Sequence, residues 1–178
     1  AALLQAINHS IVKSLMFCTT GSILMKYRTR NLEKIRGMLK AAPLTSLLFI
    51  LGALALLGMP PLSTFMSKFT IISAGFAGGH IWLMIFVLLS LAVIFAALMK
   101  VISSAVFGEM SEGMVRGDVK PWGLIPLAIL GVFIFLLGVY IPPQLDTLLN
   151  QATNIIMAGQ SAIVNSDGLI NFTKMLVP

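Results

Sequence analysis

The stretch LALLGMPPLSTFMSKF, residues 54–69, decides the fold of this chain. It lies inside an apolar segment over residues 43–76, and a run of this length is typical of a helix in a membrane. A proline inside a helix removes a backbone donor and clashes with the preceding turn. Pro60 and Pro61, which follow Gly58, therefore force a break. The sequence predicts one discontinuous helix that is interrupted here.

The composition of the whole chain places this helix in a membrane protein. Of the 178 residues, 58% are hydrophobic and 10% are charged. An average soluble domain carries about 25% charged residues. So few charges do not solvate the surface of a soluble globule, and the high apolar content excludes disorder.

The net charge of +6 does not indicate nucleic-acid binding, because the cations are gathered in one connector. Six of the twelve Lys and Arg residues lie within residues 26–40, between two apolar segments. Cationic connectors beside membrane helices mark the cytoplasmic side. We therefore expect this connector to face the cytoplasm.

Four apolar segments predict an all-α, polytopic bundle of transmembrane helices. The expected membrane domain covers residues 1–141, with crossings at 2–25, 43–76 (broken at 58–61), 81–107 and 122–141. Apolar residues then recur at helical spacing over residues 142–160, which predicts a short amphipathic helix on the outer surface. Residues 161–178 have no assignable pattern. The chain opens inside a helical pattern, so we expect it to be part of a longer polypeptide or a split subunit.

The broken segment over residues 43–76 fits a membrane in either of two ways. As one straight helix it would be about 50 Å long, against a hydrocarbon core of about 30 Å. A hairpin would place residues 109–120, which carry two cations, outside. One tilted, discontinuous crossing puts residues 26–40 and 109–120 together on the cytoplasmic side. The distribution of Lys and Arg favours the discontinuous crossing.

The first apolar segment carries polar side chains where lipid would exclude them. Gln5, His9 and Lys13 are spaced at i, i+4 and i+8, so they form one stripe along a helix. Lys13 lies roughly 20 Å along the axis from Lys26, too far for its stem to reach the interface. A buried ammonium costs about 2.5–3.5 kcal/mol on insertion scales. Lys13 therefore needs water, a carboxylate partner or loss of its proton.

Lys68 presents the same problem in the broken segment, with Thr64 one turn before it on the same face. Backbone groups freed by a helix break are tolerated at membrane depth only in a cavity or against protein. The break and the lysine together favour a hydrated site near the midplane, where a lysine can bind and release a proton. Lys100 is a further relay candidate, although it is also close enough to Gly108 to reach the interface.

A structural role remains the alternative for each of these residues. Lys13 and Lys68 would then pair with acids on a neighbouring subunit, and His9 would be a packing hydrogen bonder. The six acidic residues all fall in connectors or in the tail, so any buried counter-charge comes from outside this chain. The sequence contains no phosphate-binding glycine loop, no Cys/His cluster and no nucleophile–base pair. We therefore expect no catalytic centre, no metal site and no cofactor in this chain.

Two motifs resemble those of a known family. Residues 8–17, NHSIVKSLMF, resemble the NHAxxKxLLF helix of antiporter-like proton-channel subunits, and residues 54–69 resemble their LAxxGxPPxxxFxSK/E discontinuous helix. Such subunits occur in respiratory complex I, in group 4 membrane-bound hydrogenases and in multisubunit Na+/H+ antiporters. The Asn8-His9 pair and the sequence of the basic connector are most similar to the branch that holds the hydrogenase-4 component F and the formate hydrogenlyase membrane proteins.

The resemblance implies a function and a role for the candidate residues. His9 and Lys13 would belong to a central hydrophilic axis, and Lys68 would guard the exit toward the outer face. The chain would translocate protons as a membrane-arm subunit of an oxidoreductase of the NADH:quinone or nickel–iron hydrogenase kind. The alternatives are a subunit of a Na+/H+ antiporter, with sodium as the coupled ion, and a scaffold that conducts nothing.

The resemblance also implies partners and a location. We expect the amino-terminal half of the same subunit or a split counterpart, other membrane-arm subunits, a peripheral redox module and lipid. A nickel–iron centre, iron–sulfur clusters or quinone are expected only in partner subunits. The implied location is the inner, cytoplasmic membrane of a prokaryote.

Overall fold

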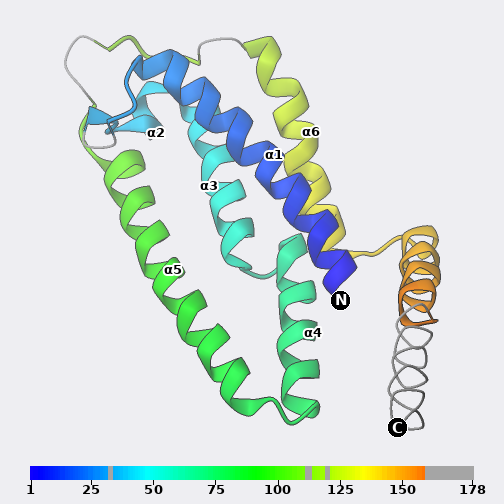
Figure 1. Cartoon of the computed structure of the whole chain (residues 1–178). Helices are drawn as coiled ribbons and strands as arrows, with labels where there is room; N and C mark the ends of the chain where they lie inside the picture. The colour runs from blue at the N-terminus through cyan, green and yellow to red at the C-terminus, as the bar shows by residue number, and fades with distance from the viewer. Residues whose placement is uncertain (32–33, 111–113, 119–120, 159–178) are drawn as a thin grey trace, which may run out of the picture. The chain divides into compact units, whose positions relative to one another are not determined.

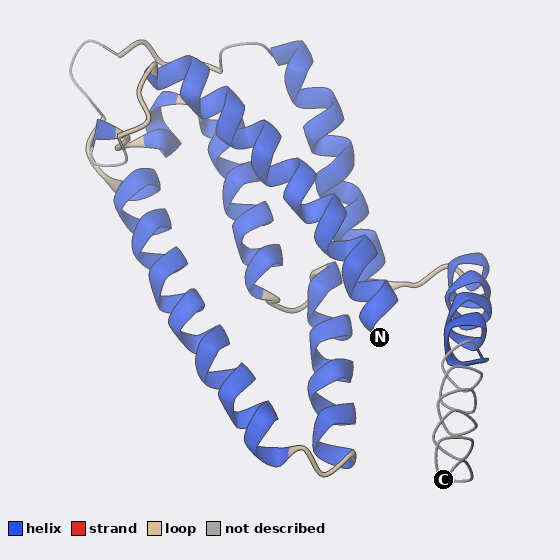
Figure 2. Cartoon of the chain, viewed as in Figure 1, coloured by secondary structure: helices blue, strands red, loops and turns tan. Residues whose placement is uncertain are grey.

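The computed structural model describes residues 1–31, 34–110, 114–118 and 121–158. The chain divides into two compact units, residues 1–140 and residues from 141 onward. The helices of the first unit are α1 (Ala2–Tyr27), α2 (Met38–Ala41), α3 (Pro43–Leu57), α4 (Ser63–Ala77), α5 (Ile81–Phe107) and α6 (Pro121–Val139) (Figure 1). The second unit contains a helix over residues 143–158. The described residues form no strand (Figure 2), which confirms the all-α class.

The apolar helices of the first unit are built for a lipid environment. Within the described residues, α5 and residues 122–139 of α6 are long and apolar enough to cross a membrane, and α3 is a shorter apolar helix. Only 6% of the most apolar window of α5 is buried inside the unit. An apolar helix that is exposed nearly all round needs lipid or another protein around it. The fold is a polytopic transmembrane helix bundle.

The broken segment forms two helices that share one direction. α3 ends at Leu57 and α4 begins at Ser63. In Figure 1, α4 continues the descent of α3 away from the connectors, and α5 then returns. A hairpin at the break would reverse the chain there, and the two helices do not show such a reversal.

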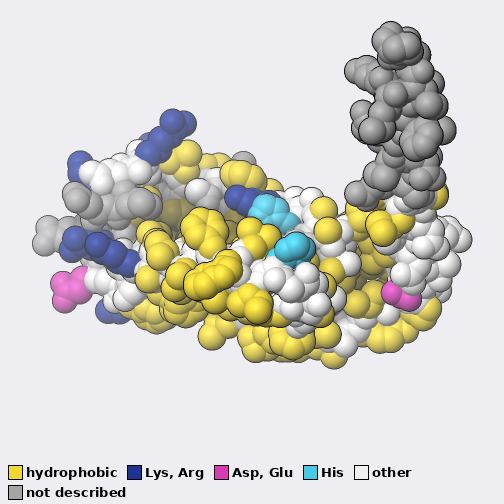
Figure 3. Space-filling model, turned by 60° about the horizontal axis from the view of Figure 1, so that its bottom comes forward, with side chains coloured by type: hydrophobic (Ala, Val, Ile, Leu, Met, Phe, Trp, Pro, Cys, Tyr) yellow, Lys and Arg dark blue, Asp and Glu magenta, His cyan; other side chains and the backbone are white. Residues whose placement is uncertain are grey.

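Both polar connectors lie at the same end of the unit. The Lys26 ammonium donates to the carbonyls of Val115 and Gly117, at 2.7 Å each. The Gly117 amide donates to the Ala41 carbonyl at 2.9 Å. On the face shown in Figure 3, most Lys and Arg side chains gather at one end of the first unit. The short α2 in the first connector is not signalled by the sequence, because four residues are too few to show a helical period.

Asp118 ties the second connector to the start of α3. Its Oδ1 accepts from the Thr45 amide at 3.0 Å and from the Thr45 hydroxyl at 2.5 Å. Its Oδ2 accepts from the Leu44 amide at 3.4 Å. The residue before α3 is Ala42, whose side chain offers no acceptor. Asp118 therefore supplies from a distant loop the cap that the helix lacks locally.

The core has two parts, one on each side of the middle of α3. The first lies near the connectors and joins α1, α2, α3 and α5; its buried members are Ile23, Tyr27, Ile35, Met38, Ala41, Phe49, Ala53, Ile102, Ala105 and Val106. The second lies beside the break and joins α1, α3 and α6; its buried members are Val12, Leu15, Ala55, Leu62, Leu124, Leu127 and Ile134. The break is therefore packed against two neighbouring helices.

Candidate functional site

The break itself is a well-formed helix end. Gly58 adopts the left-handed conformation, with φ 83°. Its amide donates to the Ala55 carbonyl at 3.0 Å, and the Met59 amide donates to the Leu54 carbonyl at 3.1 Å. This pair of bonds is the Schellman arrangement, which glycine favours because a Cβ is strained at positive φ. The peptide bond between Pro60 and Pro61 is cis.

Lys68 reaches back across the break. Its Nζ donates to the Leu56 carbonyl at 2.7 Å. The stem runs directly over Gly58, where an added Cβ would lie 2.9 Å from the Lys68 Cδ. Gly58 therefore serves both the turn and the path of the lysine. The Leu56 carbonyl is one of the acceptors that the end of α3 leaves without a partner in its own helix.

Thr64 and Ser67 fasten the same stretch of α4 on two sides. The Thr64 hydroxyl donates to the Ala55 carbonyl at the end of α3. The Ser67 hydroxyl donates to Gln5 Oε1 of α1 at 2.5 Å. Both serine and threonine side chains are fully buried. The break is thus a polar junction of α1, α3 and α4 inside an apolar bundle.

Asn8 makes a further contact from α1 to the first residue of α4. Its Nδ2 donates to the Ser63 carbonyl at 2.8 Å, and its side chain is 0% exposed. Among the described residues, neither Asn8 Oδ1 nor the Ser63 hydroxyl has a hydrogen-bond partner. Unpartnered buried oxygens are costly and uncommon in native proteins. This part of the junction therefore has the capacity to hold one more polar group.

α6 closes the junction from another side through Gly138. A Cβ built there would meet the Pro61 carbonyl oxygen and would lie 2.8 Å from the Ser63 amide nitrogen. These atoms belong to the backbone, so no side-chain rotation relieves the contact. Gly138 is thus required for α6 to lie against the broken backbone.

The remaining candidates from the sequence lie elsewhere. His9 is exposed on α1, and Lys100 is exposed on α5. Lys13 is half-buried, and its Nζ lies 5.7 Å from the centre of the Phe17 ring. The structure brings together Gln5, Thr64 and Lys68 with the break, but it does not bring His9 or Lys13 into contact with Lys68.

The reason is the helical wheel of α1. The buried residues of α1 recur at Asn8, Val12, Leu15, Thr19 and Ile23. At 3.6 residues per turn, His9 and Lys13 are rotated away from that face. Gln5 lies at the edge between the two faces, which allows it to reach Ser67.

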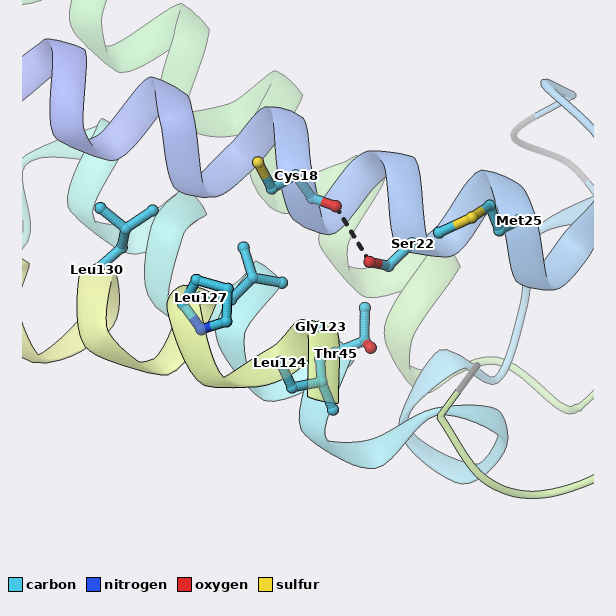
Figure 4. A pocket seen from close by; sticks show the side chains of 9 residues that line it. Cys18, Ser22, Met25, Thr45, Gly123, Leu124, Leu127 and Leu130 are labelled. Carbon is cyan, nitrogen blue, oxygen red and sulfur yellow. Dashed lines mark hydrogen bonds between the residues drawn. The ribbon is translucent and has the colours of Figure 1, made fainter. Parts of the chain in front are cut away.

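A separate pocket of about 250 Å³ lies between α1, α3 and α6. Figure 4 shows α1 side chains facing those of α6 across it; the lining residues are Cys18, Ser22, Met25, Thr45, Gly123, Leu124, Pro126, Leu127 and Leu130. The Ser22 hydroxyl donates to the Cys18 carbonyl at 3.2 Å, within α1. None of the candidate relay residues lines this pocket.

The structure adds Asn8, Ser63 and Gly138 to the residues that build the junction. The sequence carries a signal for Asn8, because it is an amide in an apolar segment next to His9. Ser63 and Gly138 carry no comparable signal, since small residues are common in membrane helices.

Comparison with known proteins gives one family match. Residues 1–96 match the family described as NADH:quinone oxidoreductase/Mrp antiporter, transmembrane. The chain is 29% identical over 157 residues to a Na(+)/H(+) antiporter subunit of Bacillus subtilis, covering 84% of this chain and 32% of that protein. It is 30% identical over 146 residues to the hydrogenase-4 component F homolog of Methylacidiphilum infernorum, covering 81% of this chain and 29% of that protein.

A third relative is an NADH-quinone oxidoreductase subunit of Escherichia coli, 28% identical over 181 residues, with 99% of this chain and 29% of that protein covered. The chain thus spans about a third of the length of these relatives. The fold is also similar to a chain in the Mrp complex from Dietzia sp. DQ12-45-1b, with a TM-score of 0.68. That match covers 74% of this chain and 33% of the other at 21% identity.

Proposed function

The chain belongs to the NADH:quinone oxidoreductase/Mrp antiporter transmembrane family, and on that premise we propose that it translocates protons through the junction at the helix break. Lys68 is the residue that takes up and releases the proton. His9 and Lys13 belong to the relay that leads to it, and Lys100 is a further member.

The observation that carries the proposal is the contact between the Lys68 Nζ and the Leu56 carbonyl, at 2.7 Å. An ammonium is stabilised there by a carbonyl that α3 does not use. No described carboxylate lies in the junction, since the described acidic residues are Glu109, Asp118 and Asp146, all in connectors or in the second unit. A lysine held by a neutral acceptor keeps less of the stabilisation that an ion pair would give its charged form, which favours release of its proton.

The junction also supports a route from α1 to Lys68. Gln5 and Asn8 contact the first turns of α4 from the same helix that carries His9 and Lys13. The hydroxyl and amide groups of this contact are able to donate and accept hydrogen bonds, whereas the packing around them is apolar. They support a polar path through α1 toward α4.

Sodium–proton exchange is the second candidate function. One relative is named as a Na(+)/H(+) antiporter subunit. The two unpartnered oxygens, Asn8 Oδ1 and Ser63 Oγ, are of the ligand type that hard cations prefer. In this alternative the sodium ion would bind at the junction and Lys68 would respond to its charge.

The setting of the proposed activity follows the relatives. We propose that the chain works with other membrane-arm subunits and lipid, and with the amino-terminal half of the subunit or a split counterpart. A peripheral redox module would supply the energy, and a nickel–iron centre, iron–sulfur clusters or quinone would reside there. The connectors over residues 26–40 and 109–120 would face the cytoplasm of a prokaryote.

Lys68→Gln in the complete assembly tests the proposal. Glutamine keeps a neutral donor near the Leu56 carbonyl but cannot carry a proton through the cycle. We expect proton uptake into proteoliposomes, measured by dye quenching and divided by redox turnover, to fall at least about tenfold. Lys40→Gln, an exposed lysine of α2, is the matched control and should leave this ratio unchanged.

Each outcome decides between the candidates. A Lys68→Gln assembly that pumps with the wild-type ratio contradicts the proposed role of Lys68. Wild-type uptake that requires sodium, and that moves labelled sodium in the opposite direction, favours exchange. Redox turnover without any proton movement in the wild-type assembly favours a scaffold.

A further inference from the structure

A second cavity lies at the cationic end of the first unit, away from the helix break. Its volume is about 240 Å³. Thr20, Ile23 and Leu24 line it from the last turns of α1, and Thr29, Arg30 and Ile35 line it from the connector that follows. This volume equals that of roughly eight waters at about 30 Å³ each.

The wall and the rim of this cavity differ in chemistry. Ile23 and Ile35 are buried, with 6% and 7% of their side chains exposed, and form an apolar floor. Arg30 is exposed and brings a guanidinium to the same cavity. An apolar chamber with a cation at its rim matches a molecule that is apolar at one end and anionic at the other.

The charges around the cavity remain uncompensated by the described acids. Arg30 forms no ion pair among the described residues, and the carboxylate of Asp118 is bonded to the start of α3. Arg28 and Lys40 lie in the same connector and are exposed as well. A guanidinium presents a fork of donors that matches the geometry of a phosphate.

We propose that this cavity binds one anionic phospholipid, with its phosphate on Arg30 and part of an acyl chain over Ile23 and Leu24. The position supports this occupant, because the cavity spans the last turns of a membrane helix and the basic connector beyond it. Basic pockets beside membrane helices at this level bind acidic headgroups. The inference does not depend on proton translocation.

Lipid binding to the complete assembly, purified in detergent, tests the proposal. Native mass spectrometry would follow dioleoyl phosphatidylglycerol, with dioleoyl phosphatidylcholine as the zwitterionic comparison. We expect the wild type to bind phosphatidylglycerol preferentially, and Arg30→Gln to weaken that binding roughly fivefold. Arg116→Gln is the matched control, since Arg116 is exposed but does not line the cavity.

A second variant tests the apolar half of the site without a change in charge. Leu24→Trp fills the cavity, and Leu24 is 37% exposed, so the larger ring does not have to enter the core. We expect it to weaken phosphatidylglycerol binding while the assembly stays intact. Equal effects of Arg30→Gln and Arg116→Gln, or no effect of Leu24→Trp, would overturn the proposal.

Two further arms identify the occupant. Inorganic phosphate should displace the lipid only at concentrations at which salt screening acts. Displacement by low phosphate would show an anion site instead of a lipid site. A photoreactive benzoylphenylalanine at Thr20 should form a lipid adduct in membranes, and an adduct with another polypeptide would assign the cavity to a protein partner.

Discussion

Lys13 is held over an aromatic ring, which sets up a sharp test of its role. The ammonium lies 5.7 Å from the centre of the Phe17 ring, within the range of a cation–π contact. A fixed charge would be satisfied by this contact, whereas a relay lysine has to lose its proton in each cycle. Arginine preserves the charge and the ring contact but does not release its proton in this range.

We therefore expect Lys13→Arg to be nearly as damaging as Lys13→Ala. The measurement is proton uptake by reconstituted assemblies, normalised to the amount of assembled complex. Phe17→Leu is the control, because it removes the ring and leaves the lysine. A Lys13→Arg assembly that pumps like the wild type would mean that Lys13 is a fixed charge.

Asn8 and Ser63 allow a comparison of a partnered and an unpartnered polar group. Asn8→Leu removes a buried hydrogen bond to the Ser63 carbonyl, and we expect it to destabilise the assembly by about 1–3 kcal/mol. Ser63→Ala removes a buried hydroxyl that has no described partner, so its cost should be below about 0.5 kcal/mol.

Thermal unfolding of the purified assembly gives both values. Ser10→Ala is the control, since this exposed hydroxyl only bonds within α1. A cost for Ser63→Ala as large as that for Asn8→Leu would contradict the prediction. It would show that the hydroxyl has a bound partner in the working protein.

Among the elements, α6 is positioned by a glycine that touches backbone. Gly138→Ala would press a methyl group against the carbonyl of Pro61 and the amide of Ser63, so α6 has to shift. Overpacking of this kind costs about 1–3 kcal/mol. We expect lower thermal stability together with impaired proton uptake, since the same backbone carries the path to Lys68.

Gly131→Ala is the matched control on the same helix. A Cβ there would lie 3.0 Å from Leu51 Cδ2, a side-chain atom that is able to move. Its effect should be clearly smaller. Equal effects of the two substitutions would mean that helix propensity or general crowding, and not the contact with the break, sets the cost.

The cap of α3 gives a second prediction at this scale. Asp118→Ala removes the acceptor for the Thr45 amide and hydroxyl, and a lost cap costs about 0.5–2 kcal/mol. We expect faster hydrogen exchange in the first turn of α3. Asp118→Asn should be milder because asparagine also caps helices, and Glu109→Ala, at an exposed site, should have no effect. Unchanged exchange in Asp118→Ala would show that the connector does not stabilise this turn.

For the whole molecule, the direction of the chain in the membrane is the testable property. The two connectors lie at one end, and the turn between α4 and α5 lies at the other (Figure 1). The excess of Lys and Arg at the connector end predicts that this end faces the cytoplasm. In a Cys18→Ser background, Val115→Cys should react only with reagents that reach the cytoplasmic side, and His80→Cys only from the outside.

Reaction of both positions from the same side would contradict a single discontinuous crossing by α3 and α4. Reaction of Val115→Cys from the outside alone would reverse the predicted orientation. Val115 suits the test because its side chain is 78% exposed.

Much of the fold follows from local chemistry that the sequence states directly. The apolar lengths, the break and the cationic connector depend on hydrophobic burial, on the proline ring and on the cost of moving cations across lipid. Gly58 and the two prolines act within a few residues of one another, so their effect is visible without any partner. The pairing of Lys68 with the break is also local, because both lie on one segment.

Contacts between distant segments were settled only by the tertiary structure. The sequence places Gln5, His9 and Lys13 on one stripe, but the packing of α1 turns Gln5 and Asn8 toward α4 and leaves His9 exposed. The cap that Asp118 gives α3 joins residues more than seventy positions apart. Such contacts depend on how helices rotate and approach one another, a choice made by the packing of many side chains at once, and no short pattern in the sequence contains it.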